Sequence, residues 1–133
     1  VADVQQAEGL RLKAYQDSVG IWTIGYGTNL QVLEIPNTLA EQWLHEKVVQ
    51  SETECYDAFP WWRVLEPVRQ RAVCELHYNM GLTTLLTFRR TLAALEVGDY
   101  ETAAQQLQAS KWARQVGPTR SGRIIAMVRT GCA

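Results

Sequence analysis

Apolar residues recur at helical spacing through most of the chain. They stand three or four positions apart in five segments, which predicts five helices over residues 39–57, 65–80, 85–97, 100–110 and 118–129. The sequence Thr38-Leu39-Ala40-Glu41 has the form of a capping box at the start of the first of these helices. Residues 59–62 (Phe-Pro-Trp-Trp) interrupt the helical pattern, and Trp112 is expected in a short turn. A further short helix is predicted over 3–8, with Asp3 as N-cap and Gly9 just past its end.

Two short strands are predicted near the start of the chain, over residues 10–16 and 21–26. They flank the turn Asp17-Ser18-Val19-Gly20, in which Asp leads and Gly closes, as a type I turn prefers. Gly25 and Gly27 flank Tyr26, so the backbone there can approach a ligand closely.

A sheet this small does not stand alone. We therefore expect an α+β, mostly helical fold and a single domain over residues 1–133. A small β-hairpin lobe at about 9–37 and a helical lobe at about 60–133 would be joined by a long helix at about 38–58.

Composition and charge narrow the function classes. With 133 residues, 47% hydrophobic and 20% charged, the chain has the make-up of an ordinary soluble globular domain. A net charge of −1 lacks the basic excess of most nucleic-acid binders. No run approaches the ~18 apolar residues of a membrane span, so we expect no stable membrane insertion. Because the chain opens on Val rather than Met, we expect that an export or anchor segment could precede it.

Three cysteines at wide spacing form neither a disulfide framework nor a metal pattern. Cys55, Cys74 and Cys132 are expected to be reduced, with one pairing as the alternative. His45 and His77 have no third ligand at metal spacing, so we expect surface or cap histidines and no metal site. Trp61-Trp62 is expected to pack at a helix junction, with a sugar platform as the alternative.

Candidate chemistry concentrates in the stretch from Glu8 to Leu30. Glycoside hydrolysis needs one carboxylic acid to protonate the leaving oxygen and one carboxylate to activate water or attack carbon. Glu8 ends the first helix, facing the negative end of its dipole, which disfavours a charged carboxylate and suits a proton donor. Asp17 opens a polar turn, and Thr23 on the facing strand could hold a water between the two acids. On spacing alone, a structural role for Asp17 is the commoner outcome.

The whole stretch resembles the signature of the phage-type lysozymes (glycoside hydrolase family 24), which include the muramidases of T-even phages. The match in residue type and spacing runs through Glu8-Gly9-Leu10-Arg11-Leu12-Lys13-Ala14-Tyr15, Asp17, Gly20 and Thr23-Ile24-Gly25-Tyr26-Gly27. It continues through Arg69-Gln70-Arg71-Ala72, His77-Tyr78-Asn79-Met80-Gly81, Ser110-Lys111-Trp112, Arg120-Ser121-Gly122-Arg123 and Val128-Arg129-Thr130-Gly131. Residues 31–60 align poorly, and two positions depart from the family: Thr28 stands where many relatives have His, and Asn29 replaces an apolar residue.

The resemblance implies a lysozyme-like fold and a residue for each catalytic role. Glu8 would be the general acid, Asp17 the carboxylate that positions or activates water, and Thr23 the hydroxyl that orients that water. The family's sugar-contacting positions fall on Asn29, Tyr78, Thr91 and Gln106. Arg120 matches an arginine that pairs with the catalytic glutamate in relatives, where it would favour the charged acid and oppose the helix dipole.

The implied activity is hydrolysis of peptidoglycan at the β-1,4 bond between N-acetylmuramic acid and N-acetylglucosamine, with inversion. No cofactor is implied, and we expect a monomer. A lytic transglycosylase and a non-catalytic wall-binding or virion structural module on the same fold stay open as alternatives. An endolysin would lie in the host cytoplasm before release to the periplasm and cell wall, although a virion-mounted enzyme fits the resemblance as well.

Overall fold

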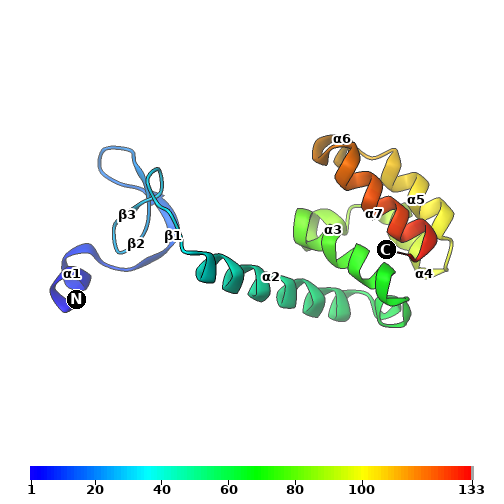
Figure 1. Ribbon diagram of the computed structural model, residues 1–133, viewed down its shortest axis with the longest axis horizontal. Coiled ribbons are helices and arrows are strands. Elements are labelled where there is room, and N and C mark those ends of the chain that lie inside the picture. Colours follow the sequence, from blue (N-terminus) through cyan, green and yellow to red (C-terminus); the bar gives the residue numbers. More distant parts are fainter. Residues whose placement is uncertain (133) are drawn as a thin grey trace. The chain divides into compact units, whose positions relative to one another are not determined.

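Helices make up most of the computed structural model, which describes residues 1–132, and a small antiparallel sheet lies near the start of the chain (Figure 1). The helices are α1 Ala2–Glu8, α2 Asn37–Ala58, α3 Pro67–Leu85, α4 Arg89–Glu96, α5 Tyr100–Gln108, α6 Lys111–Val116 and α7 Pro118–Thr130, with a 3₁₀ segment, η1, at Pro60–Val64. The predicted α+β, mostly helical class is confirmed.

The chain divides into two compact units. The first is Val1–Glu41 and the second begins at Gln42, so that α2 starts in one unit and continues in the other. That both units act as one catalytic domain joined by this helix stays a prediction.

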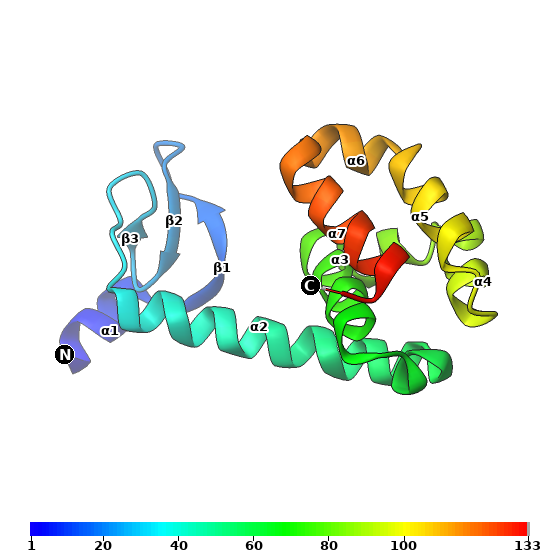
Figure 2. The same cartoon turned by 45° about the vertical axis from the view of Figure 1, so that its right-hand side comes forward.

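The first unit contains a three-stranded antiparallel sheet in the order β1-β2-β3 (Figure 2). Its strands are β1 Arg11–Gln16, β2 Trp22–Gly25 and β3 Thr28–Asn29. Thr23 lies at its centre, opposite Tyr15 on β1 and opposite Asn29 on β3. The first two strands confirm the predicted hairpin, but β3 was not predicted because two residues carry no recognisable alternation.

The second unit is built round a hydrophobic core, in which α5 packs against α4 and α7, and α7 also packs against α3 and α6. Figure 1 shows these helices gathered together. The largest fully buried side chains are Val73, Leu76, Leu85, Leu95, Leu107, Ile124 and Val128, with Cys55. Each such aliphatic side chain favours the folded state by about 1.5–3 kcal/mol relative to exposure, so this core gives the second unit its stability.

Several predicted helix ends are confirmed by their hydrogen bonds. The Asp99 side chain accepts a hydrogen bond from the Thr102 amide at 3.2 Å and so caps α5. Helix α7 begins at Pro118 and ends at Thr130. It is followed by Gly131, whose amide donates to the Met127 carbonyl at 2.9 Å and whose left-handed φ of 68° suits glycine.

Other predicted ends are wrong. Asp3 is not an N-cap, because α1 already begins at Ala2 and the carboxylate of Asp3 lies in the first turn, at the positive end of the dipole. Thr38 is not a cap either. Helix α2 begins one residue earlier, and the carbonyl of Pro36 accepts the amides of Leu39 and Ala40.

The helices around Gly81 also differ from the prediction. Helix α3 is interrupted at Gly81, with φ 80° and ψ 163°, and then continues for one more turn to Leu85. The predicted stop at Gly81 is therefore a kink. Helix α4 begins at Arg89 rather than at Leu85, because residues 86–88 form the connection between the two helices.

His77 is not the surface or cap histidine that was predicted. It is 5% exposed, and its Nδ1 lies 2.9 Å from the Ser51 hydroxyl. Its Nε2 lies 2.6 Å from Oε2 of Glu54 but makes no well-aligned hydrogen bond. His77 follows buried Val73 by four residues and buried Cys74 by three, which puts it on the buried side of α3.

The cysteines and the tryptophan pair follow the prediction. Cys55, Cys74 and Cys132 are unpaired, and the first two are buried. Trp61 and Trp62 pack against the core at the junction between α2 and α3, and the Trp62 indole donates a hydrogen bond to the Gln70 carbonyl at 3.0 Å. None of the helices described is both long and apolar enough to cross a membrane.

Candidate active site

Asp17 is held by the turn that follows β1. The Gly20 amide donates to the Asp17 carbonyl at 3.0 Å and closes the turn. Oδ1 of Asp17 accepts hydrogen bonds from the amides of Val19 and Ile21, each at 2.9 Å. One carboxylate oxygen is thus fixed by backbone, while Oδ2 makes no hydrogen bond within residues 1–132. A carboxylate held this way has a defined direction and a lone-pair face left for another partner.

The Thr23 side chain bonds to the backbone of Ile21, which also bonds to the Asp17 side chain. Thr23 is buried, and its hydroxyl donates to the Ile21 carbonyl at 2.9 Å. That carbonyl also accepts the Asp17 amide at 2.9 Å, so Ile21 links the two side chains through both its N–H and its C=O. Because a hydroxyl has one proton and two lone pairs, Thr23 keeps acceptor capacity for a water molecule.

Glu8 is brought to the turn between β2 and β3. It is the exposed last residue of α1, where Gly9 turns the chain with a φ of 70°. A Cβ at Gly27 would lie 2.5 Å from Oε2 of Glu8 and 3.0 Å from its Cδ. The missing side chain at Gly27 therefore makes room for the Glu8 carboxyl group, a role that sequence reasoning assigned to an outside ligand.

Asn29 lies on β3, directly across from Thr23. Its Oδ1 accepts the Gln31 amide at 2.8 Å, so the acceptor half of the side chain is used within the loop. The Nδ2 group stays available to donate to a ligand. The predicted catalytic residues and Asn29 thus all lie in the first unit, on the small sheet, in its first turn or at the end of α1.

The predicted site residues of the second unit fall into two separate hollows. Tyr78 on α3 and Arg120 on α7 line a hollow of about 560 Å³, which we call the Tyr78 hollow. Its wall also contains Glu52, Arg71 and Trp62. Tyr78 is 40% exposed, so a ring face is open to a ligand. The pairing of Arg120 with Glu8 stays a prediction.

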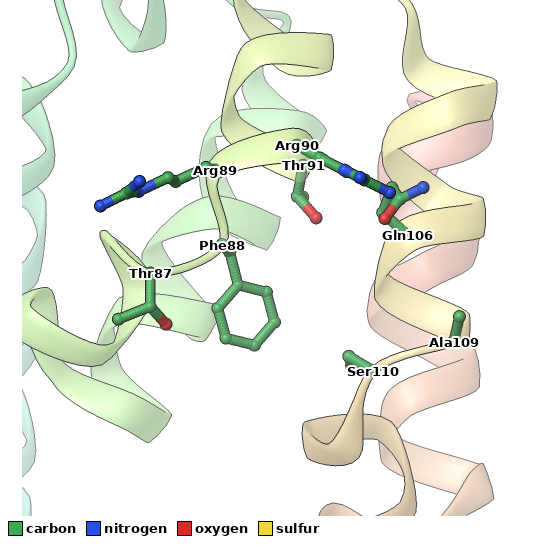
Figure 3. Close-up of a pocket in the computed structure, with 8 residues that line it drawn as sticks. All are labelled: Thr87, Phe88, Arg89, Arg90, Thr91, Gln106, Ala109 and Ser110. Atoms are coloured by element: carbon green, nitrogen blue, oxygen red, sulfur yellow. The ribbon is translucent and has the colours of Figure 1, made fainter.

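Thr91 and Gln106 line the other hollow, of about 440 Å³, which we call the Thr91 hollow (Figure 3). It lies between α4 and α5 and is completed by Phe88 and Ser110 among others. Thr91 and Gln106 line this hollow, whereas Tyr78 and Arg120 line the other one. That these residues contact one glycan strand stays a prediction.

Sequence reasoning missed two features of these sites. Gly27 was recognised as permissive, but its contact with a residue nineteen positions earlier could not be derived from local pattern. Arg89 and Arg90, which line the Thr91 hollow, were not singled out. Their signal is two adjacent cations at the start of a helix, where acidic residues are preferred. Within residues 1–132, no three His, Cys, Asp or Glu side chains gather as metal ligands would.

Comparison with known proteins gives a consistent result. A sequence model of the family described as "Phage lysozyme" matches residues 5–126. An endolysin of Acyrthosiphon pisum secondary endosymbiont phage 1 is 36% identical over 117 residues, covering 84% of this chain and 75% of that protein. Probable T4-type lysozyme 1 of Dictyostelium discoideum is 26% identical over 153 residues, covering 93% and 89%.

A virion protein is also similar. The pre-baseplate central spike protein Gp5 of Enterobacteria phage T4 is 26% identical over 156 residues, which cover 96% of this chain but 27% of the spike protein. Because the family match spans nearly the whole chain and includes every residue of the predicted catalytic group, this chain belongs to the phage lysozyme family.

Proposed function

We propose that this protein is an endolysin-type peptidoglycan hydrolase that cleaves the β-1,4 bond between N-acetylmuramic acid and N-acetylglucosamine. The observation that carries the proposal is the pair of Asp17 and Thr23, both fixed by Ile21, in the same unit as a glutamate seated against Gly27. Membership of the phage lysozyme family supports a glycosidase acting on the bacterial cell wall.

Glu8 acts as the general acid. It ends a helix and is exposed, so it can reach the glycosidic oxygen of a bound strand. In glycoside hydrolysis, a carboxylic acid in this role protonates the leaving oxygen as the bond breaks. Gly27 holds the space in which the Glu8 carboxyl group lies.

Asp17 activates the attacking water molecule, and Thr23 orients it. Oδ2 of Asp17 accepts a proton from it, while the Thr23 hydroxyl, having donated to the Ile21 carbonyl, accepts a hydrogen bond and fixes its orientation. Attack then comes from the face opposite the leaving oxygen and inverts the anomeric carbon, a geometry in which the two carboxyl groups stand about 6.5–9.5 Å apart.

The remaining predicted residues bind the glycan strand. Nδ2 of Asn29 is free to donate because its Oδ1 is engaged by the Gln31 amide. Tyr78 stacks on a sugar face, and Thr91 and Gln106 donate hydrogen bonds to hydroxyl or N-acetyl groups. By family resemblance, we propose Arg120 as the ion-pair partner of the acid.

A second candidate function follows from the similarity to the T4 spike protein, which is part of a virion. A chain of this family mounted on a virion could act during infection, or serve only as a wall-binding or structural module. An endolysin instead leaves the host cytoplasm at lysis and acts on the cell wall. We favour a catalytic protein over the non-catalytic module because Glu8, Asp17 and Thr23 are all present.

A turbidity assay on permeabilised Gram-negative cells separates a catalytic protein from a non-catalytic wall-binding or structural module. Wild type and the exposed control Glu34→Gln should clear the suspension, and Glu8→Gln should not. Binding without clearing by wild type would favour the non-catalytic module. Clearing by Glu8→Gln at the wild-type rate would show that Glu8 is not the acid.

The products distinguish hydrolysis from transglycosylation. Hydrolysis leaves reducing ends, whereas a lytic transglycosylase leaves 1,6-anhydro ends, which mass spectrometry detects as a loss of water. NMR of the first products, before mutarotation, should show the inverted α-anomer.

A further inference from the structure

A third hollow, of about 340 Å³, is lined by residues of α2 and α3, and we call it the His77 hollow. Helix α2 contributes Gln50, Ser51 and Glu54 to its lining, and α3 contributes His77. All four residues belong to the second unit. The proposed hydrolysis uses none of these side chains, so their arrangement needs a separate explanation.

The His77 ring is held from one side by Ser51. Nδ1 of His77 lies 2.9 Å from the Ser51 hydroxyl, and both residues are buried. In the neutral tautomer with its proton on Nδ1, the ring donates to Ser51 and leaves a lone pair on Nε2. Histidines that bind metal ions usually donate from the other ring nitrogen to a fixed oxygen in this way, which holds both the ring and its tautomer.

Nε2 of His77 is a buried atom that makes no hydrogen bond with any residue in the range 1–132. Oε2 of Glu54 lies beside it at 2.6 Å, but off the direction in which the ring nitrogen forms bonds. A proton on Nε2 would therefore be a buried donor without an aligned acceptor, which carries a free-energy cost. Two ligands of one metal ion stand in this relation, because each directs its lone pair at the ion rather than at the other ligand.

The distances fit an ion with small adjustments. At bond lengths of about 2.0–2.2 Å, neighbouring ligands of a tetrahedral or octahedral ion stand roughly 3.0–3.4 Å apart, so the Glu54 carboxylate has to move by roughly half an ångström. Its side chain is 38% exposed, which leaves room for that movement and for water. Gln50 lies four residues before Glu54, so both side chains are on one face of α2.

We propose that Glu54 and His77 bind one divalent transition-metal ion, such as Zn²⁺. Because no third His, Cys, Asp or Glu side chain joins them within residues 1–132, water and the amide oxygen of Gln50 complete the coordination. Imidazole nitrogen with carboxylate oxygen suits zinc, nickel or cobalt better than magnesium or calcium. Lys47 also lines the hollow, but it is exposed and its ammonium group extends into water. The ion joins α2 to α3 and stabilises the second unit, a role separate from glycan hydrolysis.

Isothermal titration of the full chain with zinc tests the site. Every protein carries Cys132→Ser, because an exposed thiol also binds zinc. We expect one equivalent to bind, and His77→Gln and Glu54→Gln to weaken its affinity at least tenfold. Ser51→Ala should weaken it about tenfold, the lower end of the usual effect of removing the partner of a ligating histidine. The matched control His45→Gln, which removes an exposed histidine of α2, should leave zinc affinity unchanged.

Thermal unfolding gives a second readout and guards against variants that fail to fold. Zinc at about a hundredfold excess over Kd should raise the Tm of the Cys132→Ser protein by about 5–10 °C. Glu54→Gln, at a partly exposed position, should unfold at the same temperature with and without zinc. Neither readout depends on hydrolase activity, so failure of the proposed function leaves this test intact.

Three results would overturn the proposal. The first is no zinc binding at millimolar concentration. The second is binding that His45→Gln abolishes and His77→Gln preserves, which would show a surface histidine only. The third is zinc affinity in Glu54→Gln equal to that of the parent, or magnesium binding as tight as that of zinc, since either would contradict the assigned ligands.

Discussion

Arg69 provides the sharpest stability prediction, because a single buried guanidinium joins α3 to the end of α7. Its Nε donates to the Val128 carbonyl at 2.7 Å, and Nη2 donates to the Arg129 carbonyl at 3.0 Å. Its Cζ lies 3.5 Å from the ring centroid of Tyr100, and Nη1 forms an ion pair with Glu66 at 2.9 Å. The two carbonyls are in the last turn of α7, where intrahelical donors are absent.

The magnitude follows from these contacts. A hydrogen bond to a charged group contributes about 1.5–3 kcal/mol, and two are lost in Arg69→Met. The partly desolvated cation–π contact adds about 1 kcal/mol, and the ion pair with exposed Glu66 adds little. Methionine keeps most of the apolar stem and removes a buried charge, which offsets part of the loss. We expect the free energy of unfolding to fall by about 3 kcal/mol.

Urea unfolding followed by circular dichroism at 222 nm measures this loss, since the second unit is helical. At typical slopes for a domain of this size, the midpoint should fall by about 1–2 M. Arg71→Met is the matched control, because Arg71 lies two residues away on α3 and is exposed. A loss below about 1 kcal/mol, or one equal to that of Arg71→Met, would refute the claim that Arg69 fastens α7.

Two further predictions concern the acid and the thiols. Gly27→Ala should lower kcat at least tenfold, because the added Cβ would lie 2.5 Å from Oε2 of Glu8. The control Gly98→Ala, with a similar positive φ and nothing within 4 Å, should lower stability to a similar extent but spare kcat. Equal activity in the two variants would contradict the contact. Burial raises the pKa of the Cys55 thiol to about 12 and that of Cys74 to about 11, with nearby acidic groups adding to both shifts. At pH 8 these thiols should therefore resist Ellman's reagent until guanidinium is added, while the third cysteine, which is exposed, reacts at once; three fast thiols in the native protein would contradict this.

Much of the fold could be predicted because local signals act over short distances. Asp99 caps α5 through a side chain that bonds three residues ahead, and Gly131 ends α7 by adopting a conformation that other residues avoid. Such features need no tertiary information.

The predictions that were wrong also have physical causes. Helix α6 was expected as a turn because six residues are too few to show a period, although Ser110, whose hydroxyl accepts the Ala113 amide at 3.2 Å, was a usable cap signal. His77 was predicted to be exposed because it is polar, but it is buried because it lies on the core-facing side of α3.

Some features of the candidate site could likewise be predicted from the sequence, and others could not. The hairpin with Asp17 and Thr23 was readable from turn chemistry and family resemblance, and both signals reside in adjacent residues. Nothing local indicates that Ile21 would bond to both side chains, or that Glu8 would lie against Gly27. These contacts depend on how strands and helix meet.

The central claim is that Glu8 protonates the leaving sugar, and one measurement tests it most directly. Purified peptidoglycan is digested with wild type, Glu8→Gln and the control Glu34→Gln, and the initial rate of reducing-end release is measured. The account predicts equal rates for wild type and Glu34→Gln, and for Glu8→Gln a rate at least about a hundredfold lower, at unchanged unfolding midpoint. A Glu8→Gln rate within a few-fold of wild type would contradict it.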